Sequence, residues 1–123
     1  MRKKELDLNK NEDHHLIKIG EWQKRLKVVY QGGGKSKIVK HHSKGKMTAR
    51  ERIEYLVDDP KEVMELGAFA GYDMYPEYGG CPSGGVVTVV AKVSEKMCVI
   101  IANDATVKAG AWFPITGKKN LRA

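Results

Sequence analysis

The sequence predicts an α/β chain in which helices precede a β-hairpin and another helix follows it. Three observations lead to this prediction. Apolar residues recur at three- and four-residue steps between residues 13 and 30, the spacing of an amphipathic helix. Two segments rich in β-branched residues, 85–93 and 97–103, predict paired strands. Pro114 suits the first turn of a closing helix.

The first predicted helix covers residues 13–30 and ends at the glycines 32–34. Glycine readily adopts the left-handed conformation that helices use at their C-termini, which makes it a common stop. A polar, basic loop is expected over residues 35–46, because lysines and histidines dominate there.

A second helix is predicted to begin after Thr48. The Thr48 hydroxyl and Glu51, three residues later, have the spacing of a capping box. Pro60 follows two aspartates and marks the end of this helix. Its buried face is expected to consist of Ile53, Leu56 and Val57.

The second half is predicted to be mainly strand and irregular connection. Residues 63–66 form a possible short strand, and six glycines over 67–85 indicate an irregular link. A turn at 94–96 joins the two β-branched segments, neither of which alternates cleanly, so we expect both of their faces to be covered. An isolated two-stranded hairpin is only marginally stable in water. The chain is therefore expected to be incomplete on its own, and either to begin a longer protein or to pair with other chains.

Positive charge is concentrated in the first part of the chain. The net charge is +7; residues 1–50 hold 14 basic and 5 acidic side chains, whereas residues 51–123 hold 8 and 10. A basic segment can attract nucleic acid, anionic lipid or a phosphate-bearing small molecule. The apolar stretches are far shorter than the roughly 18–20 residues that a bilayer requires, so a membrane span is excluded, and no membrane is expected as a partner. Two cysteines make no disulfide framework, which favours a cytoplasmic location.

Several local patterns resemble functional motifs without completing them. The segment 32–36 looks like the end of a P-loop, but Val29 stands where that motif has a glycine. The histidine pairs 14–15 and 41–42 lack neighbours at zinc-ligand spacing, so no metal site is predicted. Aromatic residues are absent between Gly32 and Arg52, which argues against single-stranded nucleic acid as a partner.

The most informative stretch follows the last predicted strand. Small residues between 102 and 110 would let a ligand approach the main-chain N–H groups before the helix at Pro114. Asp104 is at a strand end, where a structural role is the commoner one. Cys81 has no neighbouring base that would activate it, and Cys98 is expected in the core.

Several segments together resemble one family of enzymes. In order they are Gly32-Gly33-Gly34-Lys35, Ser43-Lys44-Gly45-Lys46-Met47-Thr48-Ala49-Arg50-Glu51-Arg52-Ile53, Glu65-Leu66, Ala102-Asn103-Asp104-Ala105-Thr106-Val107-Lys108, Pro114-Ile115-Thr116 and Lys118-Lys119-Asn120-Leu121-Arg122-Ala123. With them the chain resembles the carboxyltransferase (β) subunit of biotin-dependent acyl-CoA carboxylases, and most closely the 3-methylcrotonyl-CoA carboxylase branch.

The resemblance implies a crotonase-like fold of stacked ββα units in a subunit several times longer than this chain. It implies that carboxybiotin, carried by a biotin carboxylase or biotin carrier partner, gives its carboxyl group to an acyl-CoA. Main-chain N–H groups stabilise the developing negative charges in that family. The resemblance also implies a homo-oligomer, located in the cytoplasm or, in a eukaryote, in the mitochondrial matrix.

The resemblance assigns no catalytic side chain within these 123 residues. It suggests contact between the acyl-CoA and the main chain of Val107, Lys108, Ala109 and Gly110. The candidates for binding the phosphates of coenzyme A are Lys44, Lys46 and Arg50, with Lys108 as a further one. The alternative is that Arg50 and Arg52 form ion pairs with Glu51, Glu54 or Asp58, on the same helix or nearby.

Two residues depart from the family pattern. Ala109 stands where the family has a glycine, which matters if that position needs a positive φ angle. Gly117 replaces a β-branched residue and would weaken the last helix by about 1 kcal/mol relative to alanine.

The chain is expected to divide into an amphipathic helix over 1–31, a basic loop and capped helix over 32–60, and the truncated start of the carboxyltransferase N-terminal domain over 61–123. The expected function is that of the N-terminal portion of a 3-methylcrotonyl-CoA carboxylase carboxyltransferase subunit, inactive as a fragment. Two alternatives stay open: a subunit for propionyl-CoA or another acyl-CoA, and a non-catalytic basic binding or assembly module.

Overall fold

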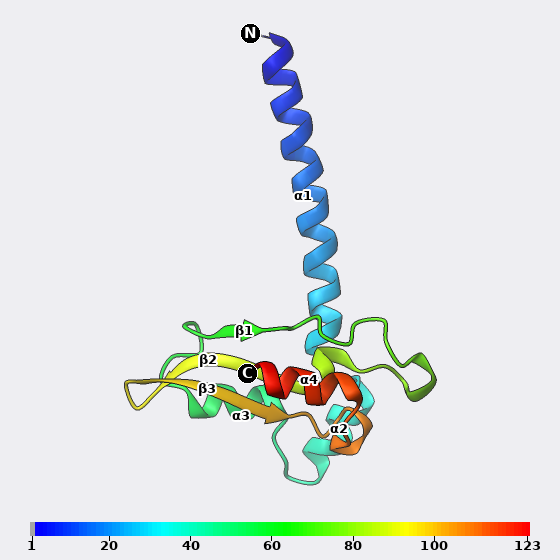
Figure 1. Ribbon diagram of the computed structural model, residues 1–123, viewed down its shortest axis with the longest axis vertical. Coiled ribbons are helices and arrows are strands. Elements are labelled where there is room, and N and C mark those ends of the chain that lie inside the picture. Colours follow the sequence, from blue (N-terminus) through cyan, green and yellow to red (C-terminus); the bar gives the residue numbers. More distant parts are fainter. Residues whose placement is uncertain (1) are drawn as a thin grey trace.

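The computed structural model describes residues 2–123, with a long helix rising from a small α/β body (Figure 1). The long helix is α1 (Arg2–Tyr30), and three further helices belong to the body: α2 (Lys35–Ser43), α3 (Ala49–Leu56) and α4 (Pro114–Arg122). The strands are β1 (Met64–Leu66), β2 (Val86–Val93) and β3 (Lys96–Asn103). No helix in the described part of the chain is both long and apolar enough to cross a membrane.

Helix α1 extends well before the periodic segment 13–30, close to the expected bounds of 1–31, and is largely solvent-exposed. Leu16, Ile19 and Trp22 on it are 59%, 49% and 51% exposed, so the predicted apolar face lacks a full partner within residues 2–123. Only the C-terminal end is anchored: Val29 is 2% exposed, and the Trp22 ring lies 6.3 Å from that of Phe69.

The prediction of a basic loop over residues 35–46 is wrong, because most of this segment is helix α2. The segment contains neither glycine nor proline before Gly45, and its lysines are good helix formers. None of its nine residues is buried, so it carries no hydrophobic stripe that would have revealed the helix.

The capping box of helix α3 is confirmed. The Thr48 hydroxyl accepts a hydrogen bond from the Glu51 N–H, and a Glu51 carboxylate oxygen accepts one from the Thr48 N–H at 2.7 Å. Ile53 and Val57 are buried as expected. Leu56 is half exposed, contrary to expectation, since it lies outside the contact with the sheet.

The three strands form an antiparallel sheet in the order β1-β2-β3. Val86 pairs with Asn103 and Val93 with Lys96, which confirms the predicted hairpin. Its turn residues, Ser94 and Glu95, both have positive φ angles, of 49° and 66°. Each donates its N–H to the Asp58 carboxylate at 2.7 Å, so Asp58 holds a turn made without glycine.

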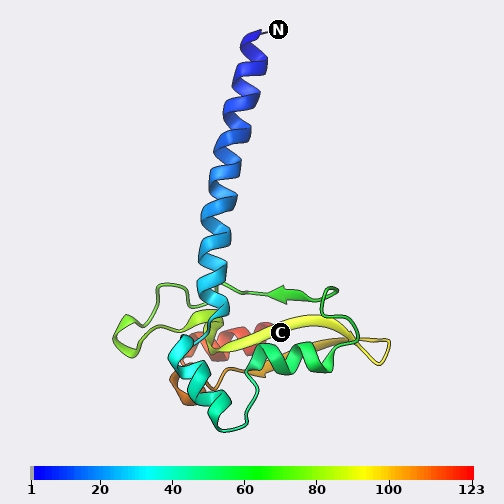
Figure 2. The same cartoon turned by 180° about the vertical axis from the view of Figure 1, so that it is seen from behind.

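The prediction that both strands are covered on both faces holds for β2 and fails for β3. Helices α3 and α4 lie on opposite faces of the sheet, as Figure 1 and the reverse view in Figure 2 show together. Strand β2 runs between them, whereas β3 is at the sheet edge and leaves Val99 and Ile101 about half exposed. Cys98 is therefore only partly buried and does not belong to the core.

The main core lies between α3 and the sheet. Its buried residues are Ala49, Ile53, Val57, Val87, Val89 and Ala91. A smaller cluster of Cys81, Val107 and Phe113 packs with Tyr75 and Ile115 beside α4.

The turn at Pro82–Gly85 is held by two cations from opposite sides. Arg50 of α3 donates to the Ser83 hydroxyl at 3.2 Å, and Lys119 of α4 donates to the Ser83 and Val86 carbonyls at 2.7 Å each. The Lys119 side chain is nearly inaccessible, with 8% of the residue exposed. Burial lowers the pKa of Lys119 to about 8; the Glu65 carboxylate opposes this shift, and Arg50 adds to it.

Replacing Lys119 by methionine is expected to lower the free energy of unfolding by about 1–3 kcal/mol at pH 7, because two carbonyls lose their donor. The adjacent exposed lysine provides the matched control, Lys118→Met, which should change stability little. Equal effects of the two substitutions in chemical denaturation would contradict this role.

Stability should also depend on pH through Lys119. Between about pH 8 and 10.5 the unfolded chain keeps the Lys119 proton while the folded chain releases it, so stability rises with pH in that window. Lys119→Met lacks this titration. The stability gap between wild type and variant is therefore expected to widen by about 2 kcal/mol from pH 7 to pH 10; a constant gap would show that Lys119 titrates normally.

Candidate functional site

The body carries a basic cavity between helix α2 and the turn after β3. Lys37, Lys40 and Lys44 are spaced by three and four residues, which places them on one side of α2. Together with His41, Ala105, Thr106 and Ala109 they line a cavity of about 370 Å³. Three lysines that line one cavity together with small side chains make a surface suited to a polyanion.

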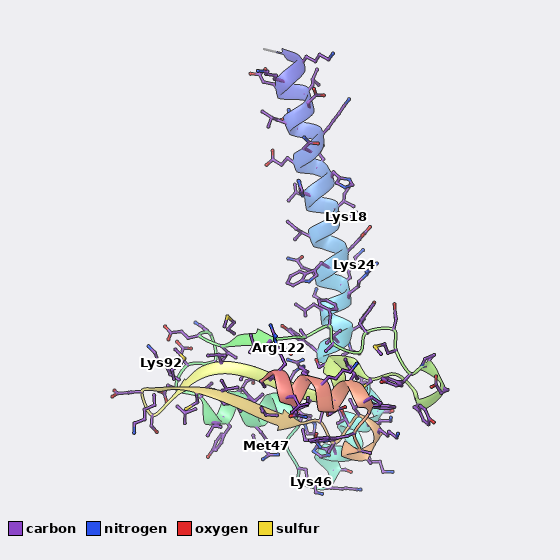
Figure 3. The ribbon with its side chains drawn as sticks, in the orientation of Figure 1. Lys18, Lys24, Lys46, Met47, Lys92 and Arg122 are labelled. Atoms are coloured by element: carbon purple, nitrogen blue, oxygen red, sulfur yellow. The ribbon has the colours of Figure 1, made fainter. Side chains whose placement is uncertain are left out.

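A second cavity continues the first toward helix α3. It has a volume of about 460 Å³, and its lining includes Lys46, Arg52 and Asn103. His41 and Ala105 line both cavities, so the two adjoin. Figure 3 shows Lys46 and Met47 on the link between α2 and α3, at the end of the body opposite α1. We call this surface, from Lys37 to Lys46 with Ala105 at its centre, the basic groove.

Two of the four predicted phosphate-binding side chains line the basic groove and two are engaged elsewhere. Lys44 and Lys46 line it. The Arg50 guanidinium instead forms a two-point ion pair with Glu65, at 2.8 and 2.9 Å, and lies 4.1 Å from the centre of the Tyr30 ring. The Lys108 ammonium lies 4.2 Å from the centre of the Phe113 ring, a cation–π contact.

The ion-pair alternative for Arg50 is therefore met by a different partner from those expected. The sequence suggested Glu51, Glu54 or Asp58, on the same helix or nearby, whereas Glu65 lies on β1. Lys37 and Lys40, which also line the cavity, are not among the phosphate candidates that the sequence suggested. Residues 37, 40 and 44 have the spacing of one side of a helix. That spacing is informative only after the segment is known to be helical, and the sequence predicted a loop there.

The main chain at Val107–Gly110 forms a short turn that uses two of its own N–H groups. Val107 donates to the Asp104 carbonyl and Gly110 to the Val107 carbonyl, at 3.1 and 2.9 Å. The Lys108 and Ala109 N–H groups take no part in these two hydrogen bonds, so they are the donors of this block that a ligand could use. Both residues have positive φ angles, of 46° and 53°.

Asp104 has a structural role. It is 9% exposed, and one carboxylate oxygen accepts hydrogen bonds from both the N–H and the hydroxyl of Thr106, at 2.9 and 2.6 Å. This pair closes the start of the turn that borders the basic groove.

The histidines of α2 form local contacts. His42 meets the Glu51 carboxylate at 2.8 Å, and His41 meets the Met47 carbonyl at 3.0 Å. The Thr48 N–H, followed by His42, lowers the pKa of Glu51. In residues 2–123, no group of three or more His, Cys, Asp or Glu side chains is arranged to hold a metal ion.

Cys81 is buried and is poorly suited to be a nucleophile. It is 1% exposed, and this burial raises the pKa of its thiol; a hydrogen bond with Thr116 and the charge of Lys119 act in the opposite direction.

Comparison with solved structures identifies the fold. A transcarboxylase 12S hexamer with hydrolysed methylmalonyl-coenzyme A bound matches with a TM-score of 0.76 and 29% identity, over 85% of this chain and 21% of the other. The body is thus a partial crotonase-type carboxyltransferase fold, as the sequence suggested.

Comparison of sequences identifies the family. The carboxyl transferase domain family matches residues 40–123. A probable methylcrotonoyl-CoA carboxylase beta chain of Drosophila melanogaster is 46% identical over 85% of this chain. A biotin-dependent 3-methylcrotonyl-coenzyme A carboxylase beta1 subunit of Mycobacterium tuberculosis is 39% identical over 90% of it. The chain belongs to the carboxyl transferase domain family, and it spans about a fifth of the length of these two relatives, 18% and 21%.

Ala109→Gly is expected to stabilise the protein by about 1 kcal/mol. Ala109 has a φ angle of 53°, a left-handed conformation that disfavours a Cβ atom and suits glycine. The matched control is Ala111→Gly: Ala111 has a φ angle of −70°, so the same change there should only add chain entropy to the unfolded state and destabilise. Loss of stability from both substitutions in denaturant titrations would refute the strain at Ala109.

Proposed function

We propose that this chain forms the N-terminal, coenzyme A-binding part of a carboxyltransferase subunit that carboxylates 3-methylcrotonyl-CoA. The basic groove carries the proposal: three lysines of one helix side face the turn that ends the Asn103–Lys108 block. The identity to beta chains named for methylcrotonyl-CoA supports this choice of acyl group.

In this proposal the basic groove binds phosphate groups of coenzyme A. Lys37, Lys40 and Lys44 are solvent-exposed, so their ammonium groups are free to meet an anion while their stems line the cavity. Lys46 extends the same surface toward Arg52. Arg50, already paired with Glu65, would act on the groove only by fixing α3.

The Lys108–Ala109 main chain is the proposed contact for the acyl-CoA beside these lysines. The carboxyl group itself would arrive on biotin carried by a partner subunit or domain, and no chemical step is assigned to a side chain of this segment. The N–H groups of Lys108 and Ala109 would hold and orient the substrate, because those of Val107 and Gly110 already bond within the turn.

Exposed apolar surface supports the proposal that this segment is one part of a larger, oligomeric assembly. Val99 and Ile101 on the edge strand and Leu16 and Ile17 on α1 are each about half exposed or more. A location in the cytoplasm, or in the mitochondrial matrix of a eukaryote, fits this function. The boundaries expected near residues 31 and 60 stay predictions.

Removing the three groove charges tests the coenzyme site. In the assembled carboxylase, the combined substitutions Lys37→Ala, Lys40→Ala and Lys44→Ala are expected to raise KM for the acyl-CoA about tenfold. Each exposed ion pair contributes up to about 1 kcal/mol, and about 1.4 kcal/mol is a factor of ten. Weaker dependence of KM on salt should accompany the change.

The matched control removes three exposed lysines near the other end of the sheet, Lys61, Lys92 and Lys96. Figure 3 shows Lys92 at the hairpin end, away from Lys46. The control has the same change in net charge, so equal KM increases in both variants would exclude a local phosphate site. Lys46→Ala, measured alone, tests whether the second cavity takes part.

Substrate preference distinguishes the remaining alternatives. The assembled enzyme should show a higher kcat/KM for 3-methylcrotonyl-CoA than for propionyl-CoA. The reverse order would favour the propionyl-CoA alternative. Absence of carboxylation with either substrate, in an assembly that folds and carries biotin, would favour a non-catalytic module.

A further inference from the structure

The link between α1 and α2 lies in direct contact with the turn after β3. The Gly33 N–H donates to the Thr106 hydroxyl oxygen at 2.9 Å, across 73 residues of sequence. A Cβ atom on Gly33 would lie 1.8 Å from the Thr106 carbonyl oxygen, which no side chain could accommodate. The neighbouring Gly32 is also crowded, because a Cβ atom there would lie 2.5 Å from an Asp104 carboxylate oxygen. Gly32 and Gly33 are therefore required by the contact itself, whereas a Cβ atom on Gly34 would meet nothing within 4 Å.

The partners of the Thr106 hydroxyl fix its orientation. Its single hydrogen goes to the Asp104 carboxylate at 2.6 Å, so the oxygen is free to accept from Gly33. Asp104 is held in turn by its own N–H, which donates to the Gly85 carbonyl at 3.0 Å, next to the start of β2. Asp104 and Thr106 are 9% and 5% exposed, so water competes little for these bonds. We call Asp104, Thr106 and Gly33 the link clamp.

The link clamp sets the place of helix α2. Helix α2 starts at Lys35, two residues after Gly33, and has no buried residue to hold it by packing. At its far end, His41 contacts the Met47 carbonyl before α3 and His42 contacts Glu51 of α3. The Lys37 stem passes directly over the clamp, since its Cδ would lie 3.0 Å from a Cβ atom on Gly33.

We propose that Asp104 and Thr106 are positioning residues that set the affinity for coenzyme A by holding the lysine side of α2 against the Ala105–Ala109 turn. This inference rests on the proposed function of the basic groove. Neither side chain is assigned a contact with the substrate. Thr106 borders the cavity, but its hydroxyl is fully used by Asp104 and Gly33.

A role of the link clamp in stability alone would affect folding rather than coenzyme A binding. The main core lies between α3 and the sheet and includes none of the clamp residues. Loss of the clamp should therefore move α2 while the core persists. The specific expectation is a change in coenzyme A binding that exceeds any change in folding.

The test uses the assembled carboxylase with Thr106→Val and Thr106→Ser. Valine keeps the shape and removes the hydroxyl, so KM for the acyl-CoA and the dissociation constant for free coenzyme A should both rise fivefold to tenfold, with kcat changed less than twofold. Serine keeps the hydroxyl and should restore both constants to within twofold of wild type. A fall in kcat alone, or a serine variant as impaired as the valine variant, would overturn the proposal.

Two glycine substitutions, Gly33→Ala and its control Gly117→Ala, give a second, independent test. Gly33→Ala places a methyl group against the Thr106 carbonyl, whereas Gly117→Ala adds one where nothing lies within 4 Å. Gly33→Ala should weaken coenzyme A binding at least tenfold, and Gly117→Ala should leave it unchanged. Where Gly33→Ala fails to fold, the Thr106 pair alone decides. Unchanged binding in a folded Gly33→Ala enzyme would overturn the proposal.

A double-mutant cycle separates this inference from the proposed function. In the background lacking Lys37, Lys40 and Lys44, Thr106→Val should change coenzyme A affinity less than twofold, because no lysines remain to be positioned. A further fivefold loss in that background would make Thr106 a direct contact and overturn the positioning role. If the lysine substitutions themselves have no effect, the basic groove fails as a coenzyme site; if they weaken binding and Thr106→Val does not, only the positioning role fails.

Discussion

The Arg50 guanidinium connects four separate segments of this protein. It lies over Tyr30 at the end of α1, pairs with Glu65 of β1 at two points, reaches Ser83 before β2, and itself belongs to α3. Planar, two-point pairing fixes direction as well as distance, which a lysine could not do. Buried ion pairs contribute little net stability, so the importance of Arg50 lies in geometry: it sets how the helices meet the sheet.

The basic groove depends on a second constraint, the absence of side chains at Gly32 and Gly33. The main chain at these glycines contacts the turn after β3, and this contact fixes the position of α2, which has no buried residue. A charged surface on a helix without a core side can be oriented only by polar contacts at its ends. The surface that would bind the substrate and the features that fix its position are therefore distinct sets of residues.

Local chemistry determined most of the elements that the sequence predicted. The capping box at Thr48 and Glu51, the hairpin over 86–103 and the helix at Pro114 depend on neighbours within a few residues or on β-branched composition. The ordered motif segments from Gly32 to Ala123 together indicated the family, and the one around Asn103–Lys108 indicated the turn that borders the site. Helix α2 was missed because lysine-rich segments without an apolar stripe read equally as loop.

The sequence by itself thus determined the order of the elements other than α2, the family and two residues of the groove, Lys44 and Lys46. Only the tertiary structure decided that Lys37 and Lys40 join them, that Arg50 pairs with Glu65, and that Ala109 occupies a left-handed conformation. The physical reason is distance along the chain: Gly33 meets Thr106 across 73 residues and Arg50 meets Glu65 across 15. Contacts of that separation depend on how helices dock onto a sheet, which no local pattern records.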